Sequence, residues 1–182
     1  QAVTMTTDKM LSDVQKGIRN KFFTFMGTGT GSASGATVQA ALANAWGQLQ
    51  VLFDDDTIDS VYFMNPLDVA SYLGTAQIST QNAFGMKYVE DFLGLGKTFF
   101  NSSVPKGKIY STAEENLVLY YVPVNGADLD EAFAFTSDET GYIGIHEFPD
   151  YTNMTASDTV VNGMKLMAER IDGVVVGTIA GE

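Results

Sequence analysis

One histidine and two acidic clusters carry the side chains best suited to acid–base or metal chemistry. His146 is the only histidine and precedes Glu147, and the acidic clusters are Asp54-Asp55-Asp56 and residues 128–131. A single histidine cannot build a multi-histidine zinc site, and neither cluster has the spacing or the glycine of a calcium-binding EF-hand. We therefore predict that His146 is a partly buried strand residue. Both clusters are expected to be solvated loops or helix ends that bind no specific metal.

A glycine-rich stretch at residues 27–35 lies between an apolar run and a helix-like segment, which is the setting of a dinucleotide-binding turn. Its glycines Gly27, Gly29 and Gly31 have the spacing G-x-G-x-G. The dinucleotide fingerprint G-x-G-x-x-G would place its third glycine at Ser32 instead. The stretch is therefore predicted to be a flexible surface loop.

Residues 94–98, Gly-Leu-Gly-Lys-Thr, resemble the end of a phosphate-binding P-loop, in which backbone N–H groups and the lysine hold phosphates. The leading glycine of that motif would fall at Asp91, whose carboxylate would repel phosphate. The residues that follow, including Pro105, do not continue as a helix. We predict a turn between two strands.

A hydrolytic site is equally unsupported, because the sequence has no G-x-S-x-G elbow and His146 has no evident serine partner. Asn101 and Asn153 each begin a glycosylation acceptor pattern, which arises often by chance. The residues thus predict a protein that is not an enzyme, with no catalytic, cofactor-binding or metal site. A small phosphate-handling or hydrolytic domain using His146 or residues 94–98 is kept as an alternative.

Length and charge narrow the class of protein further. The 182 residues suffice for one domain with a sizeable core, and the absence of cysteine excludes disulfides and thiolate metal sites. A formal net charge of -12 repels phosphate backbones, so we expect no specific nucleic-acid site. No run approaches the ~18 apolar residues of a membrane span, which predicts a soluble protein without a membrane partner. Because the chain starts at Gln1, we expect it to be part of a longer polypeptide.

The segment that organises the chain is a short apolar strand, residues 60–64, followed by Asn65-Pro66 and a helix. Val61 to Met64 are strong strand formers, and proline is favoured at the first position of a helix. Asn65 is the expected N-cap. An apolar strand without polar alternation should be covered on both faces, so we place it at the centre of the sheet.

The remaining pattern predicts an α+β fold with a central mixed or antiparallel sheet flanked by helices. Helical spacing indicates an amphipathic helix at residues 7–19 and a longer helix at 36–53. Residues 75–82 and 125–130 are expected to be polar loops, and residues 112–115 a capping box. Short strands, arranged as a meander after residue 82, are predicted at 22–26, 84–90, 97–100, 108–110, 116–122, 132–135, 142–145 and 171–179.

The order of these elements resembles the major capsid proteins of tailed bacteriophages, whose shell fold is shared with herpesvirus capsids and bacterial encapsulins. The likeness lies in residues 46–53, 61–68, 84–89 leading through 104–108 to 117–121, and 167–176. It implies a single capsid-like domain over residues 1–182, with about 36–145 axial-like and both ends peripheral-like.

The resemblance implies a structural subunit of a phage or prophage capsid shell that assembles into pentamers and hexamers. Its partners would be copies of itself in capsomers and other phage structural proteins, with no small-molecule substrate or cofactor. Its place would be the virion, and the bacterial host cytoplasm before assembly. An encapsulin-like compartment protein or a phage accessory protein is the alternative. We expect the chain alone to be monomeric or weakly associated, with any oligomer a small ring, and a full-length parent to form closed particles.

Overall fold

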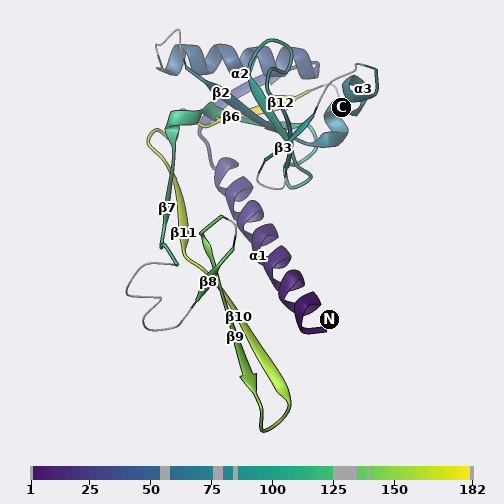
Figure 1. Ribbon diagram of the computed structural model, residues 1–182. Helices are drawn as coiled ribbons and strands as arrows, with labels where there is room; N and C mark the ends of the chain where they lie inside the picture. Colours follow the sequence, from purple (N-terminus) through teal and green to yellow (C-terminus); the bar gives the residue numbers. More distant parts are fainter. Residues whose placement is uncertain are drawn as a thin grey trace. The chain divides into compact units, whose positions relative to one another are not determined.

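The computed structural model describes residues 2–53, 58–75, 80–83, 86–124, 135–138 and 140–180. The chain divides into two compact units (Figure 1). We call Phe22–Val118 with Ala168–Glu182 the sheet unit, and Gln1–Lys21 with Leu119–Met167 the hairpin unit. Helix α1 (Ala2–Met26) begins in the hairpin unit and ends in the sheet unit.

The sheet unit is built on one mixed seven-stranded sheet. Its strands, in spatial order, are β1 (Gly31–Gly35), β12 (Val175–Ile179), β6 (Lys108–Ala113), β2 (Ser60–Met64), β5 (Lys97–Phe100), β4 (Met86–Val89) and β3 (Gln81–Ala83). The pairs β1–β12 and β2–β5 are parallel and the others antiparallel. Helices α2 (Val38–Phe53) and α3 (Pro66–Thr75) complete the unit. The predicted α+β class with a mixed sheet is confirmed, whereas the predicted meander is wrong because β2 and β5 run parallel.

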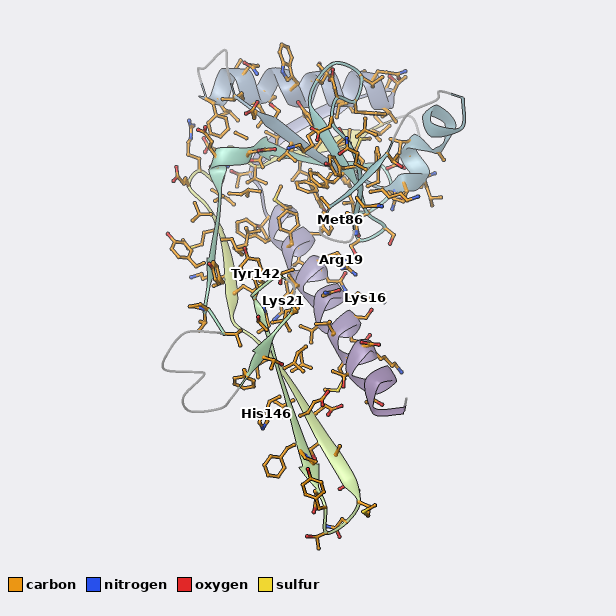
Figure 2. The ribbon with its side chains drawn as sticks, in the orientation of Figure 1. Lys16, Arg19, Lys21, Met86, Tyr142 and His146 are labelled. Atoms are coloured by element: carbon orange, nitrogen blue, oxygen red, sulfur yellow. The ribbon has the colours of Figure 1, made fainter. Side chains whose placement is uncertain are left out.

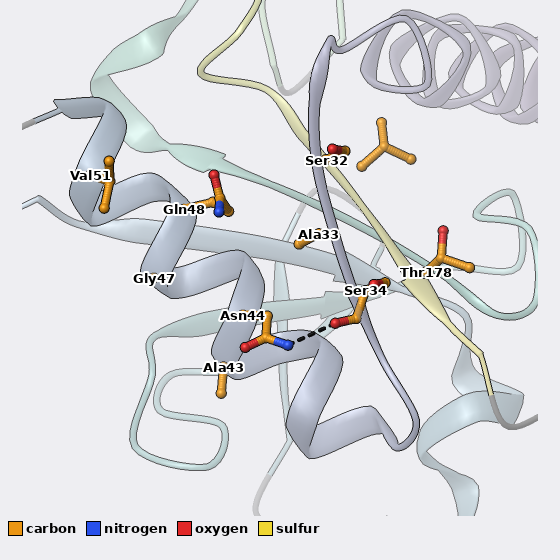
Figure 3. Close-up of a pocket in the computed structure, with 10 residues that line it drawn as sticks. Ser32, Ala33, Ser34, Ala43, Asn44, Gly47, Gln48, Val51 and Thr178 are labelled. Atoms are coloured by element: carbon orange, nitrogen blue, oxygen red, sulfur yellow. Dashed lines mark hydrogen bonds between the residues drawn. The ribbon is translucent and has the colours of Figure 1, made fainter.

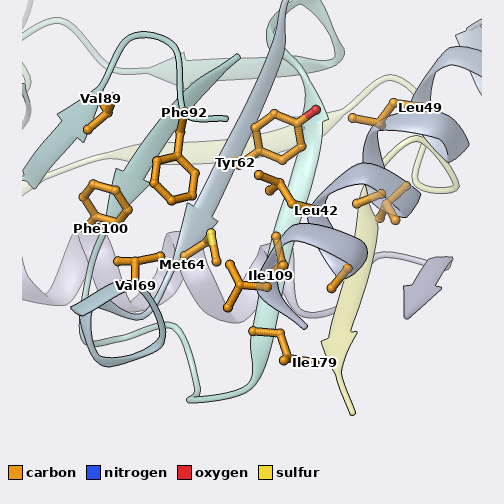
Figure 4. Packing of buried hydrophobic residues seen from close by; sticks show 14 residues of the cluster. Leu42, Leu49, Tyr62, Met64, Val69, Val89, Phe92, Phe100, Ile109 and Ile179 are labelled. Atoms are coloured by element: carbon orange, nitrogen blue, oxygen red, sulfur yellow. The ribbon is translucent and has the colours of Figure 1, made fainter. Parts of the chain in front are cut away.

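Strand β2 lies inside the sheet between β6 and β5, and all five of its residues are buried. Its side chains alternate between two core clusters. Tyr62 and Met64 join the cluster that includes Leu42 and Leu49 of α2 (Figure 4). Val61 and Phe63, whose side chains point to the other face of the sheet, join a second cluster. The prediction that this strand is central and covered on both faces is therefore confirmed.

The turn after β2 has the predicted capping chemistry. The Oδ1 atom of Asn65 accepts a hydrogen bond from the Leu67 N–H at 3.0 Å, and Pro66 is the first residue of α3. This satisfies one of the N–H groups that a helix start leaves without a partner. The Asn65 amide also donates to the Val104 carbonyl at 2.7 Å. One buried side chain thus fixes both the helix start and the loop that precedes β6.

The predicted strand at residues 22–26 is wrong, because these residues form the last turns of α1. An apolar run of this length suits a strand or a buried helix equally well, and the contacts decide. Phe23 and Met26, three residues apart, are both buried in the second core cluster, and Phe22 packs against the same cluster. The helix ends where the Gly27 N–H donates to the Phe23 carbonyl at 3.0 Å. The predicted helix at residues 7–19 is confirmed within α1.

The glycine-rich stretch is not a flexible loop throughout, because residues 31–35 form strand β1 at one edge of the sheet. Here the glycines permit close backbone approach. A Cβ atom on Gly31 would lie 2.5 Å from the Asp172 carbonyl oxygen, and one on Gly29 would overlap the backbone of Val174. Only a residue without a side chain fits at either position.

Other strand boundaries differ from the sequence predictions. Strand β3 falls largely inside the predicted loop 75–82, and residues 171–174 form a turn before β12 instead of a strand. The predicted capping box at 112–115 is wrong, since β6 continues to Ala113. A 3-10 turn follows at Glu114–Asn116, without a side-chain cap. The strands predicted at 97–100 and 108–110 are confirmed, the latter as part of β6.

Two small sheets lie mainly in the hairpin unit, although Leu117, Val118 and Ala168 belong to the sheet unit. One is three-stranded, with the order β10 (Thr155–Asn162), β9 (Ile143–Asp150), β8 (Thr136–Ser137), and the other pairs β11 (Met164–Ala168) with β7 (Leu117–Tyr121). The predicted strands at 116–122 and 142–145 are confirmed, although β9 continues to Asp150. Strand β10 was not predicted. The strand predicted at 132–135 lies outside the described residues except for Phe135, which is not in a strand.

Tyr62 gives the core a measurable pH dependence. The side chain is fully buried, and burial raises the pKa of its phenol to about 12, with a smaller opposing effect from Ser60. Within the described residues its hydroxyl has no hydrogen-bond partner. In the unfolded chain the same phenol would ionise near its ordinary pKa of 10.0. As the pH rises above that value, the unfolded state therefore loses its proton first and becomes favoured.

We expect the wild-type free energy of unfolding to fall between pH 10 and about 12, and to fall by about 2 kcal/mol less in Tyr62→Phe. At neutral pH the variant should keep most of its stability, because the hydroxyl forms no hydrogen bond of good geometry with the described residues and Ser60 acts on it less strongly than burial does. Urea unfolding across this pH range measures both quantities. Tyr120→Phe, at an exposed position, is the control and should follow the wild type. Identical pH curves for Tyr62→Phe and the wild type would contradict the assignment.

Candidate functional site: two assembly surfaces

The side chains with possible chemistry are dispersed. His146 lies half-buried on β9 (Figure 2), with its ring centroid 6.1 Å from that of Phe135 and 6.2 Å from that of Phe148. The predicted partly buried strand position is confirmed. Among the described residues, no group of three or more histidine, aspartate or glutamate side chains could hold a metal ion. Asp54, Asp55, Asp56 and residues 125–131 lie outside the described residues, so predictions about them stay predictions.

The stretch at residues 94–98 is the predicted turn between strands. The Phe92 N–H donates to the Gly96 carbonyl at 3.0 Å, and Leu93 and Gly94 have positive φ angles of 57° and 74°. Lys97 begins a strand instead of a helix, and its ammonium donates to a carboxylate oxygen of Glu114 at 3.0 Å. The lysine is thus engaged in an ion pair at the surface, and the turn leads into strand β5.

The first candidate surface is the outer part of the β9–β10 hairpin. Strand β8 pairs only with Gly144 and Ile145 of β9, so the part beyond His146 is two-stranded within the described residues. Three large apolar side chains there are mostly exposed: Phe148 by 63%, Tyr151 by 84% and Met154 by 89%. An isolated two-stranded hairpin is marginally stable in water and gains stability when one face is covered. We call Phe148, Tyr151 and Met154 the hairpin tip.

Local bonds order the turn of this hairpin. The Asp150 carboxylate accepts hydrogen bonds from the N–H groups of Thr152 and Asn153 and from the Asn153 side-chain amide. These bonds, the amide first, hold the pKa of Asp150 below its ordinary value. These bonds order the turn that carries Tyr151 and Met154, which follows directly after Phe148 and the end of β9. Asn153, the first residue of the glycosylation pattern, stabilises this turn through its hydrogen bonds to Asp150.

The second candidate surface is an open groove of about 710 Å³ in the sheet unit, between the exposed flank of α2 and strand β1 (Figure 3). The Asn44 amide bridges the two walls by donating to the Ser34 carbonyl at 2.7 Å. None of its lining residues is charged; they are Ser32, Ala33, Ser34, Ala43, Asn44, Gly47, Gln48, Val51, Val176 and Thr178. We call this feature the edge groove. Its walls offer small and amide side chains, which suit packing and hydrogen bonding and supply no acid, base or nucleophile pair.

No sequence motif indicates either surface, but the distribution of charge in the sequence does indicate the edge groove. No charged residue lies between Lys21 and Asp54, a stretch that contains β1 and all of α2. Protein interfaces are depleted of charge at their centres. The hairpin tip has a weaker signal, because β10 is mainly polar and the tip residues are divided between strand β9 and the turn that follows it.

No helix in the described part of the chain has both the length and the apolar content needed to span a membrane. No protein-family model matches the chain, and no curated protein matches its sequence.

A solved encapsulin structure shares its fold, and a second solved structure is similar to the chain. The cryo-electron-microscopy structure of the holo-SrpI encapsulin complex from Synechococcus elongatus PCC 7942 superposes with a TM-score of 0.51 and 15% identity, covering 80% of this chain and 51% of that one. The crystal structure of a virus-like particle from Pyrococcus furiosus gives a TM-score of 0.44 and 12% identity, covering 83% of this chain and 58% of that one. This chain therefore spans little more than half the length of either. The predicted fold, that of tailed-phage capsid proteins and encapsulins, is confirmed.

Proposed function

We propose that this chain is a structural subunit of a protein shell, which associates with copies of itself in capsomer-like assemblies. The observation that carries the proposal is the hairpin tip. Phe148, Tyr151 and Met154 are held outward on an ordered turn and remain uncovered in the isolated chain. Exposed apolar side chains on a projecting hairpin fit a contact with a neighbouring molecule. The fold supports the choice of a shell, because an encapsulin subunit has it too.

The interactions of the residues that are capable of chemistry support a structural role. Lys97 is paired with Glu114, and the imidazole of His146 lies beside two aromatic rings. A shell subunit acts through its contact surfaces, so it requires no nucleophile, acid or base. We accordingly propose that the protein is not an enzyme and takes no cofactor or small-molecule substrate.

Two kinds of shell are open to this fold. The first is a phage or prophage capsid of pentamers and hexamers, found in the virion and, before assembly, in the host cytoplasm, with other phage structural proteins as partners. The second is an encapsulin-like compartment, favoured by the fold of the encapsulin subunit. Particles that contain packaged DNA would support the first, and particles that contain a protein cargo would support the second. The single capsid-like domain, with residues 36–145 axial-like and both ends peripheral-like, stays a prediction.

Self-association that depends on salt tests the proposal. Each copy carries a formal net charge of -12, so copies repel one another at low ionic strength. Sodium chloride shortens the range of this repulsion to about 8 Å at physiological concentration. We expect this chain to be monomeric at low micromolar concentration without salt, and to form small rings as protein concentration and salt increase. Sedimentation velocity and electron microscopy measure the distribution.

Sucrose at the same osmolality is the control, because it is excluded from protein surfaces but does not screen charge. It should promote association less than sodium chloride does. A chain that stays monomeric from micromolar to millimolar concentration at every salt concentration would refute the shell proposal.

A further inference from the structure

Both edges of the seven-stranded sheet lie in uncharged sequence. Strand β1 forms one edge and β3 the other. The two longest stretches without a charged residue run from Lys21 to Asp54 and from Asp68 to Lys87, and each contains one of these edge strands. The chain has 32 charged residues distributed over its length, so the two edge strands are distinguished by their uncharged surroundings in the sequence.

Uncharged edge strands expose backbone groups to any passing strand. Proteins usually protect such edges with charged side chains, proline or a bulge. Strand β1 has the sequence Gly-Ser-Ala-Ser-Gly and β3 the sequence Gln-Asn-Ala, so neither has a charge or a proline. Among the described strands, each pairs on one side only. The backbone N–H and C=O groups of both edges are therefore suited to pairing with another strand.

The edge groove gives β1 the shape of a receiving site. Gly47 opens one wall, since no atom lies within 4 Å of the position where its Cβ would be. Ala43 and Ser32 add only small side chains. A positive charge lies at the rim, because the Lys108 ammonium donates to the hydroxyl of the lining residue Thr178 at 2.8 Å. A slender, uncharged segment would fit between α2 and β1.

The opposite edge has a matching chemistry. Gln81 and Asn82 of β3 are exposed, and the Gln81 side chain accepts a hydrogen bond from the Tyr88 hydroxyl at 2.9 Å. Asn82 lies opposite Lys87 of β4 in the antiparallel register. Lys87 and Lys108 place a positive charge near each edge, and acidic residues lie near both edges as well: Glu90 beside Tyr88, and Asp172 beside Gly31.

We propose that the edge groove of one copy receives the β3 edge of a second copy, which joins the copies head to tail. This inference rests on the proposed shell function and names its contact. A second copy is the favoured occupant because two molecules of charge -12 can approach most closely where the facing strand and the groove lining contain no acidic residue. A contact between two different edges is heterologous, and repeated heterologous contacts close into rings when the rotation allows. Rings are the units from which a shell is built.

The test places a negative charge inside the groove. Ala43→Glu keeps a good helix former on α2 but brings a carboxylate into the contact, where it would lose water without gaining a partner. We expect the self-association constant to fall about ten- to a hundredfold. Gln39→Glu is the matched control, since Gln39 is exposed on the same helix and does not line the groove. It adds the same charge and should weaken association less than twofold. Urea unfolding of both variants checks that each remains folded.

A compensating charge identifies the other partner of the contact. In Ala43→Glu combined with Asn82→Lys, every head-to-tail contact would bring one glutamate to one lysine. We expect the double variant to recover most of the lost association, and the recovery to fade at high salt.

The outcomes separate this contact from the shell proposal. A wild-type chain that never associates refutes the shell and the contact together. If the wild type associates and Ala43→Glu behaves like Gln39→Glu, the shell stands and the edge contact is wrong. If Ala43→Glu weakens association but Asn82→Lys gives no recovery, β3 is not the partner and the proposal is wrong.

Discussion

Replacing Gly35 with alanine is expected to lower the free energy of unfolding by about 3 kcal/mol. Gly35 ends strand β1, and a Cβ atom there would overlap backbone atoms of Ala40 and Ala41 at the start of α2. Backbone atoms of a regular helix cannot move aside as the end of a flexible side chain can. The methyl group would therefore push β1 away from α2, and their packing would be lost.

Gly47→Ala is the matched control, because the same substitution there meets open space. Gly47 lies inside α2, where alanine is favoured over glycine by about 0.5–1 kcal/mol, so this variant should be slightly more stable than the wild type. Urea unfolding at neutral pH measures both changes. Equal effects of the two substitutions would mean that residues 31–35 behave as the flexible loop predicted from the sequence, and that β1 is not packed against α2.

The parts of the fold that could be predicted are those whose local pattern admits one structure. The run Val61–Met64 followed by Asn65-Pro66 combines strand formers, a capping side chain and a proline that fits a helix start. The helix at 38–53 repeats its apolar residues at three- and four-residue steps and buries them on one face. Local preference and tertiary packing agree in both segments, so sequence reasoning succeeds there.

The parts that could not be predicted are those decided by distant contacts. Gly, Ser and Ala have little preference for strands, so β1 exists because it pairs with β12 near the other end of the chain. Strand β10 is largely polar and pairs along its whole length with β9. Both candidate surfaces depend on these unpredicted strands. The uncharged stretch between Lys21 and Asp54 could be read from the sequence, but its position at a sheet edge could not.

The aromatic run at the end of α1 leads to the second large expected effect, at Phe63. The ring of Phe63 lies 5.0 Å from that of Phe22, 5.6 Å from Phe23 and 5.5 Å from Phe99, measured between centroids. It thus joins α1 to the central strand and to β5. Phe63→Ala should lower the free energy of unfolding by about 3–5 kcal/mol, because it removes these contacts and leaves a cavity.

Phe148→Ala makes the same chemical change at the hairpin tip, where the ring is 63% exposed. A mostly hydrated side chain contributes little to the folding of its own chain, so we expect this variant to lose less than about 1 kcal/mol of stability. If the tip is covered by a neighbouring subunit, however, the buried ring contributes to association, and its loss should weaken the self-association constant about tenfold or more. Urea unfolding and sedimentation velocity on both variants therefore separate the two roles. A Phe148→Ala chain that associates like the wild type would remove the hairpin tip from the contact, and a stable Phe63→Ala chain would contradict the packing of α1 on the central strand.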